Sequence, residues 1–316
     1  MRVVPLEAFR DRIPMATAIA AVERGFRALS TGEATLPDPL VLELTDREGE
    51  VHVKGAFLAG ARHVVLKVAT GFYRNRARGL ASGDGLFLLL DAETGAPTHL
   101  LADHGYLTDL RTAAAVALTL KYLAPKDATD ALLVGAGAVA RLSARAIVAE
   151  RPIERLTIWN RTAGRAEALA KELSTVVATR VAAALEPEVR RHRLIVTATA
   201  STAPLIQAGW IGKGTHITSV GTGSPEKVEL EPEVLQKADK LIADRVSQTE
   251  RYGNLHHAMR AGVVTRDRVY AELGALAAGR VAGRESADEI TVADLTGVGV
   301  QDAGIAQAVL DALEAI

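Results

Sequence analysis

The chain has 316 residues, of which 48% are hydrophobic and 24% charged, and its 37 basic and 38 acidic side chains give a formal net charge of -1. This length is typical of about two domains, and the charge balance argues against a nucleic-acid-binding protein, which normally carries a basic excess. Cysteine is absent, which excludes disulfides, thiolate metal sites and cysteine nucleophiles.

The beginning of the chain does not resemble an export signal. Glu7 and Asp11 come earlier than acidic residues do in a secretory signal. No apolar run approaches the roughly 18 to 20 residues that a membrane span needs. We therefore expect a cytoplasmic protein without a membrane span.

The first third of the chain predicts a helix and a largely antiparallel sheet. The helix is expected from Pro14 to Thr31-Gly32, with apolar residues at helical spacing. Apolar runs bounded by glycine then predict strands, and a turn sequence at Asp91–Gly95 predicts a hairpin. The expected strands are Val51–Lys54, Val64–Val68, Leu86–Leu90 and one through Leu100-Leu101.

The rest of the chain alternates between strand and helix patterns. An alanine-rich helix is expected at Arg111–Leu123, and Ala163–Leu173 is expected to be helical as well. The five candidate strands are Ala131–Val134, Leu156–Trp159, Leu194–Thr197, His216–Val220 and Leu241–Ala243. This alternation predicts a parallel sheet covered on both faces, and the tail Ala303–Ile316 predicts an amphipathic helix packed on one domain.

The most informative motif is Gly135-Ala-Gly137-Ala138-Val139-Ala140, which fits G-x-G-x-x-A between an apolar strand and a helix. Gly135 permits a tight turn, Gly137 lets the backbone approach a pyrophosphate, and Ala140 lets the helix sit close to the strand. The alternative is a tight turn without a ligand. The motif favours an α/β fold with a doubly wound parallel sheet of the Rossmann type, joined to an N-terminal α+β domain.

The end of the next strand bears on cofactor choice. In NAD-binding sheets an acid here binds the ribose hydroxyls, but this chain has Asn160-Arg161-Thr162. An arginine and a hydroxyl can bind a 2′-phosphate, so NADP(H) is predicted to be preferred. If Arg161 merely stacks on adenine, NAD(H) remains usable.

Two further loops are expected at the nicotinamide end, because ligands bind at the carboxyl edge of such sheets. They are Thr197-Ala198-Thr199 and Ser219-Val220-Gly221. Hydroxyls and glycine there are compatible with a flat ring, although a plain polar loop is the alternative.

With these motifs the chain resembles the ornithine cyclodeaminase/mu-crystallin family over nearly its whole length. The segments that carry the resemblance are Lys67–Gly71, Leu107–Ala114, Ile158–Thr162, Pro225–Leu230 and Asp294–Asp302. The resemblance implies a substrate-binding and dimerisation domain at residues 1–120 with 295–316, and a dinucleotide-binding domain at residues 121–294. It also implies a homodimer formed through the N-terminal sheets.

The resemblance also implies roles for three residues. Lys67 matches the family's catalytic lysine, Arg111 matches an arginine that can clamp a carboxylate, and Thr112 is expected to reach the cofactor phosphates. The alternatives are an edge-strand lysine that reaches solvent and a surface arginine at a helix start.

The chain departs from the family at two positions. Val41 stands where many members have a carboxylate-binding arginine, and Lys54 is a candidate replacement unless it is an ordinary exposed lysine. Gly223 stands where cyclodeaminases have a catalytic aspartate, although Thr222 or Glu226 could occupy that space. We assign no catalytic role to Asp294 or Asp302, which flank a glycine turn and could orient the C-terminal helix.

The predicted function is an NAD(P)H-dependent oxidoreductase that interconverts a small imino acid and its amino acid by hydride transfer at Cα. An ornithine cyclodeaminase and a nicotinamide-dependent binding protein without turnover are the alternatives. No metal site is expected, because the adjacent His256 and His257 point to different faces of a helix and no other ligand spacing is present.

Overall fold

The computed structural model describes residues 1–314, apart from the side chain of Arg76. The chain divides into two compact units, each described here by itself. Unit 1 contains Met1–Arg111 and the segment that begins at Val298, and unit 2 contains Thr112–Gly297.

Unit 1 consists of helices and a mostly antiparallel sheet, and a helix with a largely antiparallel sheet was predicted for this region. The sheet order is β1-β7-β6-β5-β4-β2, with β3 paired to β4, and only the β1–β7 pair is parallel. The elements are β1 (Arg2–Pro5), α1 (Met15–Thr31), β2 (Ala34–Thr35), β3 (Leu40–Leu44), β4 (Gly49–Leu58), β5 (His63–Phe72), β6 (Gly83–Asp91), β7 (Pro97–Ala102), the start of α2 (Tyr106–Leu123) and α10 (Gly299–Glu314).

The helix starts and turns have local causes. Gly32, with φ +81°, ends α1 in the left-handed conformation that glycine adopts most readily. Asp91 accepts hydrogen bonds from Thr94 in the predicted hairpin turn between β6 and β7. Helix α2 begins five residues before the predicted Arg111, because the carboxylate of Asp103 accepts the Leu107 amide hydrogen at 2.8 Å and caps an earlier turn.

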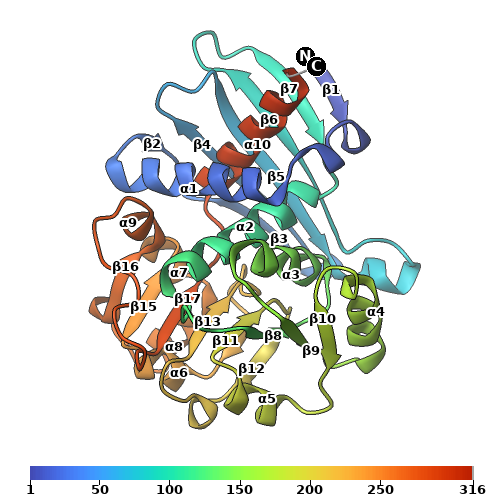
Figure 1. Cartoon of the computed structure of the whole chain (residues 1–316). Helices are drawn as coiled ribbons and strands as arrows, with labels where there is room; N and C mark the ends of the chain where they lie inside the picture. Colours follow the sequence, from blue (N-terminus) through green and yellow to red (C-terminus); the bar gives the residue numbers. More distant parts are fainter. Residues whose placement is uncertain (315–316) are drawn as a thin grey trace. The chain divides into compact units, whose positions relative to one another are not determined.

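Helix α10 packs against α1 and against strands β4 and β5 within unit 1 (Figure 1). Three glycines allow this close approach. A Cβ at Gly25 would lie 2.4 Å from the Val300 oxygen, and Cβ atoms at Gly299 and Gly304 would meet the oxygens of Gly55 and Ala21 at 2.5 Å. The expected amphipathic pattern is therefore wrong for most of α10, which is buried on nearly all sides up to Leu310. Residues 315 and 316 of the predicted helix lie outside the described residues.

Unit 2 is an α/β domain of the predicted class. Its elements after α2 are β8 (Asp130–Val134), α3 (Ala138–Glu150), β9 (Arg155–Trp159), α4 (Ala163–Leu173), β10 (Ala178–Val181), α5 (Leu185–Arg191), β11 (Leu194–Thr197), β12 (Thr202–Ile206), β13 (His216–Ser219), β14 (Val228–Leu230), α6 (Pro232–Lys237), β15 (Lys240–Ala243), α7 (Val246–Thr249), α8 (Gly253–Arg260), β16 (Val269–Glu272), α9 (Leu273–Ala277) and β17 (Thr291–Asp294).

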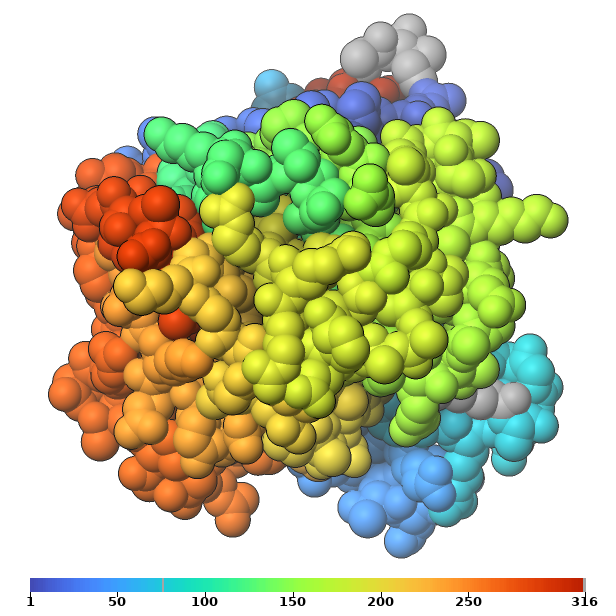
Figure 2. All heavy atoms as spheres, turned by 60° about the horizontal axis from the view of Figure 1, so that its bottom comes forward, coloured from blue at the N-terminus to red at the C-terminus, as the bar shows by residue number. Residues whose placement is uncertain are grey.

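The main sheet of unit 2 is parallel throughout, with the order β10-β9-β8-β11-β13-β17-β15-β16. It contains all five predicted strands, together with β10, β16 and β17. In Figure 2 the segments from β9 to β10 and those around β16 lie on opposite sides of the visible face, as the sheet order requires. The strand order reverses direction between β8 and β11, and this switch point is where dinucleotides bind in such sheets.

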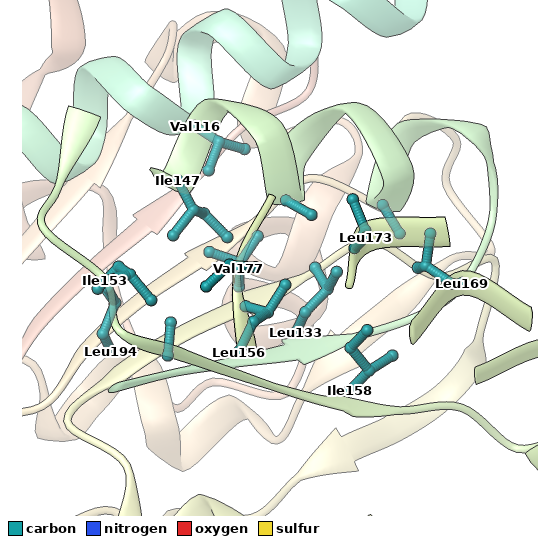
Figure 3. Close-up of a cluster of buried hydrophobic side chains, with 14 of the residues drawn as sticks. Val116, Leu133, Ile147, Ile153, Leu156, Ile158, Leu169, Leu173, Val177 and Leu194 are labelled. Atoms are coloured by element: carbon teal, nitrogen blue, oxygen red, sulfur yellow. The ribbon is translucent and has the colours of Figure 1, made fainter. Parts of the chain in front are cut away.

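Alternate residues of the central strands supply two separate cores. Leu133 of β8 and Val196 of β11 pack with helices α3 and α4, in the cluster that Figure 3 shows. Leu132 and Ile195, on the other face, pack with residues of α5, α6 and α8. A strand buried on both faces is apolar at successive positions rather than alternating, and this is the pattern of Leu132-Leu-Val134.

Candidate functional site

Two basic side chains predicted to bind substrate lie close together within unit 1. Lys67 comes from β5 and Arg111 from α2, and both contact one carboxylate oxygen of Asp302, which α10 supplies. The Lys67 Nζ lies 3.2 Å from Asp302 Oδ1, and the Arg111 Nε lies 3.1 Å from the same atom. The structure therefore brings Lys67 and Arg111 together around Asp302, a residue for which no catalytic role was expected from the sequence.

All three side chains of this cluster are buried. Lys67 is 2% exposed, Arg111 6% and Asp302 1%. Burial lowers the pKa of Lys67 from 10.5 to about 8, since the charged form loses its hydration, and Arg111 adds to this effect while Asp302 opposes it. Lys67 is thus not an edge-strand lysine that reaches solvent. With a pKa of about 8 it loses its charge at alkaline pH.

A tight turn at the start of α10 delivers Asp302 and Gln301 to the cluster. The Gln301 Oε1 accepts the Val298 amide hydrogen at 2.9 Å, and it also accepts a hydrogen bond from Arg111 Nη1 at 2.9 Å. One side chain therefore links the helix start to the guanidinium. Both residues stand in the segment Asp294–Asp302 that carried the family resemblance, so a signal for them was present in the sequence.

Lys54 lies on the same face of the sheet as Lys67. The two residues are direct partners in the antiparallel β4–β5 pair, and directly opposed residues point to the same face. Lys54 is 8% exposed, which does not fit an ordinary exposed strand lysine. Val41 on β3 is partnered by His52 of β4, two residues before Lys54 and therefore on this face as well.

Two more carboxyl groups belong to the surroundings of the cluster. Burial raises the pKa of Asp103, and it raises the pKa of Asp109 to about 6, with Arg111 opposing the latter shift. Asp103 is completely buried, whereas Asp109 is only half-buried at the first turn of α2. Asp109 can therefore change its charge close to neutral pH.

In unit 2 the glycine-rich turn has the geometry that a pyrophosphate needs. Gly135 has φ +125°, and a Cβ there would lie 2.4 Å from the Ala198 oxygen. Gly137 precedes the first residue of α3, and a Cβ on it would meet no protein atom within 4 Å. Open space beside a helix N-terminus, where Ala138 and Val139 form the first turn, is a fitting place for phosphate groups. The residues present thus fit a dinucleotide.

The predicted cofactor loops lie side by side at the carboxyl edge of the parallel sheet. The Val220 amide donates to the Thr197 oxygen at 3.0 Å, and a Cβ on Gly221 would lie 2.0 Å from the Thr199 oxygen. Together with the Gly135 contact to Ala198, these distances join the loops after β8, β11 and β13. Ser219 ends β13 and is fully buried.

Asn160, Arg161 and Thr162 follow β9, the neighbour of β8 in the sheet. The Asn160 side chain donates to the Thr162 oxygen at 3.0 Å, Thr162 precedes α4, and Arg161 is exposed. Thr112 is half-buried in α2, at the start of unit 2. None of these positions carries a carboxylate.

The segment around Gly223 contains no acidic side chain in the place of the missing aspartate. A Cβ on Gly223 would meet nothing within 4 Å. The Thr222 hydroxyl is buried and donates to Asp294 at 3.3 Å, and Ser224 donates to the Glu226 carboxylate at 2.6 Å. Both residues that could have filled the space therefore have partners elsewhere.

The histidine pair is bound to backbone groups rather than to a common point. His256 Nδ1 lies 3.0 Å from the Glu250 oxygen and His257 Nε2 lies 3.1 Å from the Lys227 oxygen. Among residues 1–314 no group of three or more histidine, aspartate or glutamate side chains could hold a metal ion. Over the same residues no helix is long and apolar enough to cross a membrane.

Comparison with known proteins places these features in a family. The model of the ornithine cyclodeaminase/mu-crystallin family matches residues 5–315. A Sinorhizobium fredii protein named Uncharacterized cyclodeaminase y4tK is 40% identical over 310 residues, which are 97% of this chain and 94% of that protein.

Solved structures with bound cofactor are similar over the whole chain. An archaeal alanine dehydrogenase dimer with bound NAD has a TM-score of 0.93 at 30% identity, covering 99% of this chain and 96% of its own. The Thermococcus litoralis Delta(1)-pyrroline-2-carboxylate reductase in complex with NADH and L-proline has a TM-score of 0.96 at 29% identity, covering 100% and 98%.

Proposed function

Since the chain belongs to the ornithine cyclodeaminase/mu-crystallin family, we propose that it is a nicotinamide-dependent oxidoreductase that interconverts a small imino acid and its amino acid. The substrate is a ketimine or a cyclic imine that carries a carboxylate beside the reacting carbon. The relatives with bound NAD or NADH, an amino acid dehydrogenase and an imine reductase, support this reaction class.

The observation that carries the proposal is the buried cluster of Lys67, Arg111 and Asp302. Two cations share one carboxylate, so these three buried side chains sum to one positive charge. The other carboxyl groups in the surroundings are Asp103 and Asp109, and burial raises the pKa of both, which favours their neutral forms. A buried surplus charge is costly unless it has a function or a partner. The carboxylate of an imino acid is a partner of the right charge, and Arg111 can bind it with two parallel hydrogen bonds.

Lys67 is the group best suited to move a proton. When the imine is reduced, a bound nicotinamide cofactor supplies the hydride that Cα receives. The nitrogen also gains a proton, and an ammonium with a pKa of about 8 holds one at neutral pH and can release it. Arg111 cannot do this, because a guanidinium stays protonated.

We propose that Lys54 takes part in binding the substrate carboxylate, in the role of the arginine that Val41 replaces. The support is its burial and its place opposite Lys67 on one face of the sheet. On the cofactor side, Thr112, Gly135, Gly137 and the loops after β9, β11 and β13 are proposed to hold the dinucleotide. We further propose that NADP(H) is preferred through Arg161, since no carboxylate follows β9 to repel a 2′-phosphate.

We propose that two copies associate through the sheet of unit 1. The face opposite Lys67 is apolar, and Leu40 and Leu42 on it are 53% and 54% exposed. They lie beside the half-buried Val53 and Val51, and Val68 continues the same face on β5. An apolar face of this extent is typical of a protein–protein interface, and a similar protein was solved as a dimer. The cytoplasmic location remains a prediction.

The deciding experiment follows oxidation of NADPH and NADH with a panel of imines. The panel contains Delta(1)-pyrroline-2-carboxylate, the imine formed from pyruvate and ammonia, and iminosuccinate, and the amino acid products are identified by mass. We expect reduction of at least one imine. Conversion of ornithine to proline and ammonia without net cofactor consumption would instead show a cyclodeaminase, and cofactor binding without any turnover would show a binding protein.

A further inference from the structure

We infer that Glu229 is a positioning residue that shapes the nicotinamide end of the dinucleotide site. This inference rests on the proposed function, because it concerns the loops to which that function assigns the cofactor. Glu229 lies on β14, outside the main sheet, and its side chain is completely buried.

The Glu229 carboxylate accepts five hydrogen bonds from the two cofactor loops. Its Oε1 accepts the Thr199 amide at 2.6 Å and the Thr199 hydroxyl at 2.7 Å. Its Oε2 accepts the hydroxyls of Thr197 and Ser219, each at 2.8 Å, and the Gly221 amide at 2.9 Å. One side chain therefore fixes the ends of β11 and β13 with respect to each other.

The space around the carboxylate is shaped for it. A Cβ on Gly221 would lie 2.6 Å from the carboxylate carbon of Glu229 and 2.0 Å from the Thr199 oxygen. The backbone dihedrals of Gly221 are not in the left-handed region, so lack of space, rather than backbone freedom, requires glycine here. The Gly221 amide can approach the carboxylate only because no side chain intervenes.

Asn254 fixes the backbone of Glu229 through hydrogen bonds. Its Oδ1 accepts the amides of Glu229 and Leu230 at 2.9 Å each, and its Nδ2 donates to the Ser219 hydroxyl and to Asp294 at 2.8 Å each. The position of Glu229 is thus set by α8 as well as by β14. Such a support holds the residues that face a ligand in one geometry.

An amide in place of this carboxylate cannot satisfy the same donors. All five groups donate, and glutamine offers one oxygen and one NH2 group, which itself donates. The hydroxyls can rotate to accept, but the backbone amides cannot. An NH2 group in place of Oε1 would face the Thr199 amide hydrogen, and one in place of Oε2 would face the Gly221 amide hydrogen. Glu229→Gln therefore moves at least one of the two loops, although the side chain keeps its size.

The adenosine half of the cofactor is expected to be bound elsewhere, by the turn after β8 and by the residues after β9. A positioning role at the nicotinamide end and a general role in stability therefore differ in outcome. We compare the dissociation constants of NADH and of ADP-ribose, which lacks nicotinamide, by calorimetry. The wild type, Glu229→Gln and the control Glu231→Gln are measured together with their melting temperatures. Glu231 is a suitable control because it accepts a backbone amide too, from Ala208 at 2.7 Å.

We expect Glu229→Gln to weaken NADH binding about tenfold or more and to leave ADP-ribose binding within about twofold of wild type. Ser219→Ala, which removes one of the five donors and is gentler on the fold, should show the same selectivity at a few-fold level. Equal losses for both ligands, or no loss for either, overturn the inference while the proposed function stands. A wild type that binds neither NADH nor NADPH overturns both, and where only NADPH binds, the same comparison is made with NADPH and 2′-phospho-ADP-ribose.

Discussion

Replacing Asp302 by asparagine should shift the pH at which the enzyme loses activity and should destabilise unit 1. The substitution keeps the shape of the side chain and removes the one charge shared by Lys67 and Arg111 at 3.2 and 3.1 Å. Both cations then remain buried without that counter-ion. Because a nearby negative charge favours the protonated lysine, its loss lowers the pKa of Lys67 below the present value of about 8.

The size of both effects follows from the burial of the cluster. Breaking a buried ion pair by removing one partner typically costs about 3 to 5 kcal/mol of stability. A change of about 1.4 kcal/mol in the interaction of a charged form moves a pKa by about one pH unit. Loss of even a third of the Asp302 interaction therefore moves the Lys67 pKa down by about one pH unit.

The assay is the pH dependence of kcat/KM for imine reduction between pH 6 and 10, with saturating reduced cofactor. If protonated Lys67 is required, wild-type activity falls as the pH rises past about 8, and the Asp302→Asn activity falls at a pH about one unit lower. Asp311→Asn is the matched control, since Asp311 lies on the same helix, is exposed and accepts a hydrogen bond only from Gln307 among the bonds described for it. An unchanged or more alkaline fall in the Asp302 variant would refute the reasoning.

Three other substitutions test separate parts of the proposal. Lys67→Ala and Arg111→Ala should each lower kcat/KM about thirtyfold or more and leave cofactor affinity unchanged, since a buried charged contact is worth roughly 2 to 5 kcal/mol. Near-normal kinetics in either variant would contradict the assigned role, and the exposed Arg62 supplies the control alanine variant. Arg161→Ala should weaken NADPH binding about tenfold to a hundredfold but not NADH binding, whereas equal wild-type affinities for the two would disprove the preference. Leu42→Glu should give monomers in analytical ultracentrifugation, because a charge would be buried between the two copies. The exposed Leu80 supplies the control, as Leu80→Glu. A dimer in the Leu42 variant would mean that another surface associates.

Most of the predicted strands of unit 2 are apolar at successive positions, although β13 carries three polar residues. The five predicted strands form, because each is buried on both faces between helices. Three strands of the same sheet were missed: β10, β16 and β17 are short and carry polar or charged residues. The polar residues of β17 are nevertheless buried, since Thr291 and Asp294 are both fully enclosed by side-chain and backbone partners.

Within the candidate site, the sequence was informative about the residues but not about their partners. Lys67 and Arg111 were predicted from the family resemblance, and Lys54 as a replacement for the arginine that many members have at the position of Val41. Asp302 could not be assigned to the same cluster, because 190 positions separate Arg111 and Gln301, which also meet in it. The role of Glu229 was also not predicted, because the groups that donate hydrogen bonds to its carboxylate come from other segments: the ends of strands β11 and β13 and the loops that follow them.

By itself the sequence determined the fold class, the position of the dinucleotide motif, the absence of cysteine chemistry and the family. These properties depend on local patterns: periodicity, a glycine turn between a strand and a helix, and residue types at short spacing. The tertiary structure alone decided that Lys67 and Arg111 are buried against the same carboxylate of Asp302. It also decided that Lys54 is buried on the same face of the sheet as Lys67 and that α10 is buried on nearly all sides. Such properties depend on packing between segments far apart in the chain, where the free energy of a charge is set by the groups that replace its water.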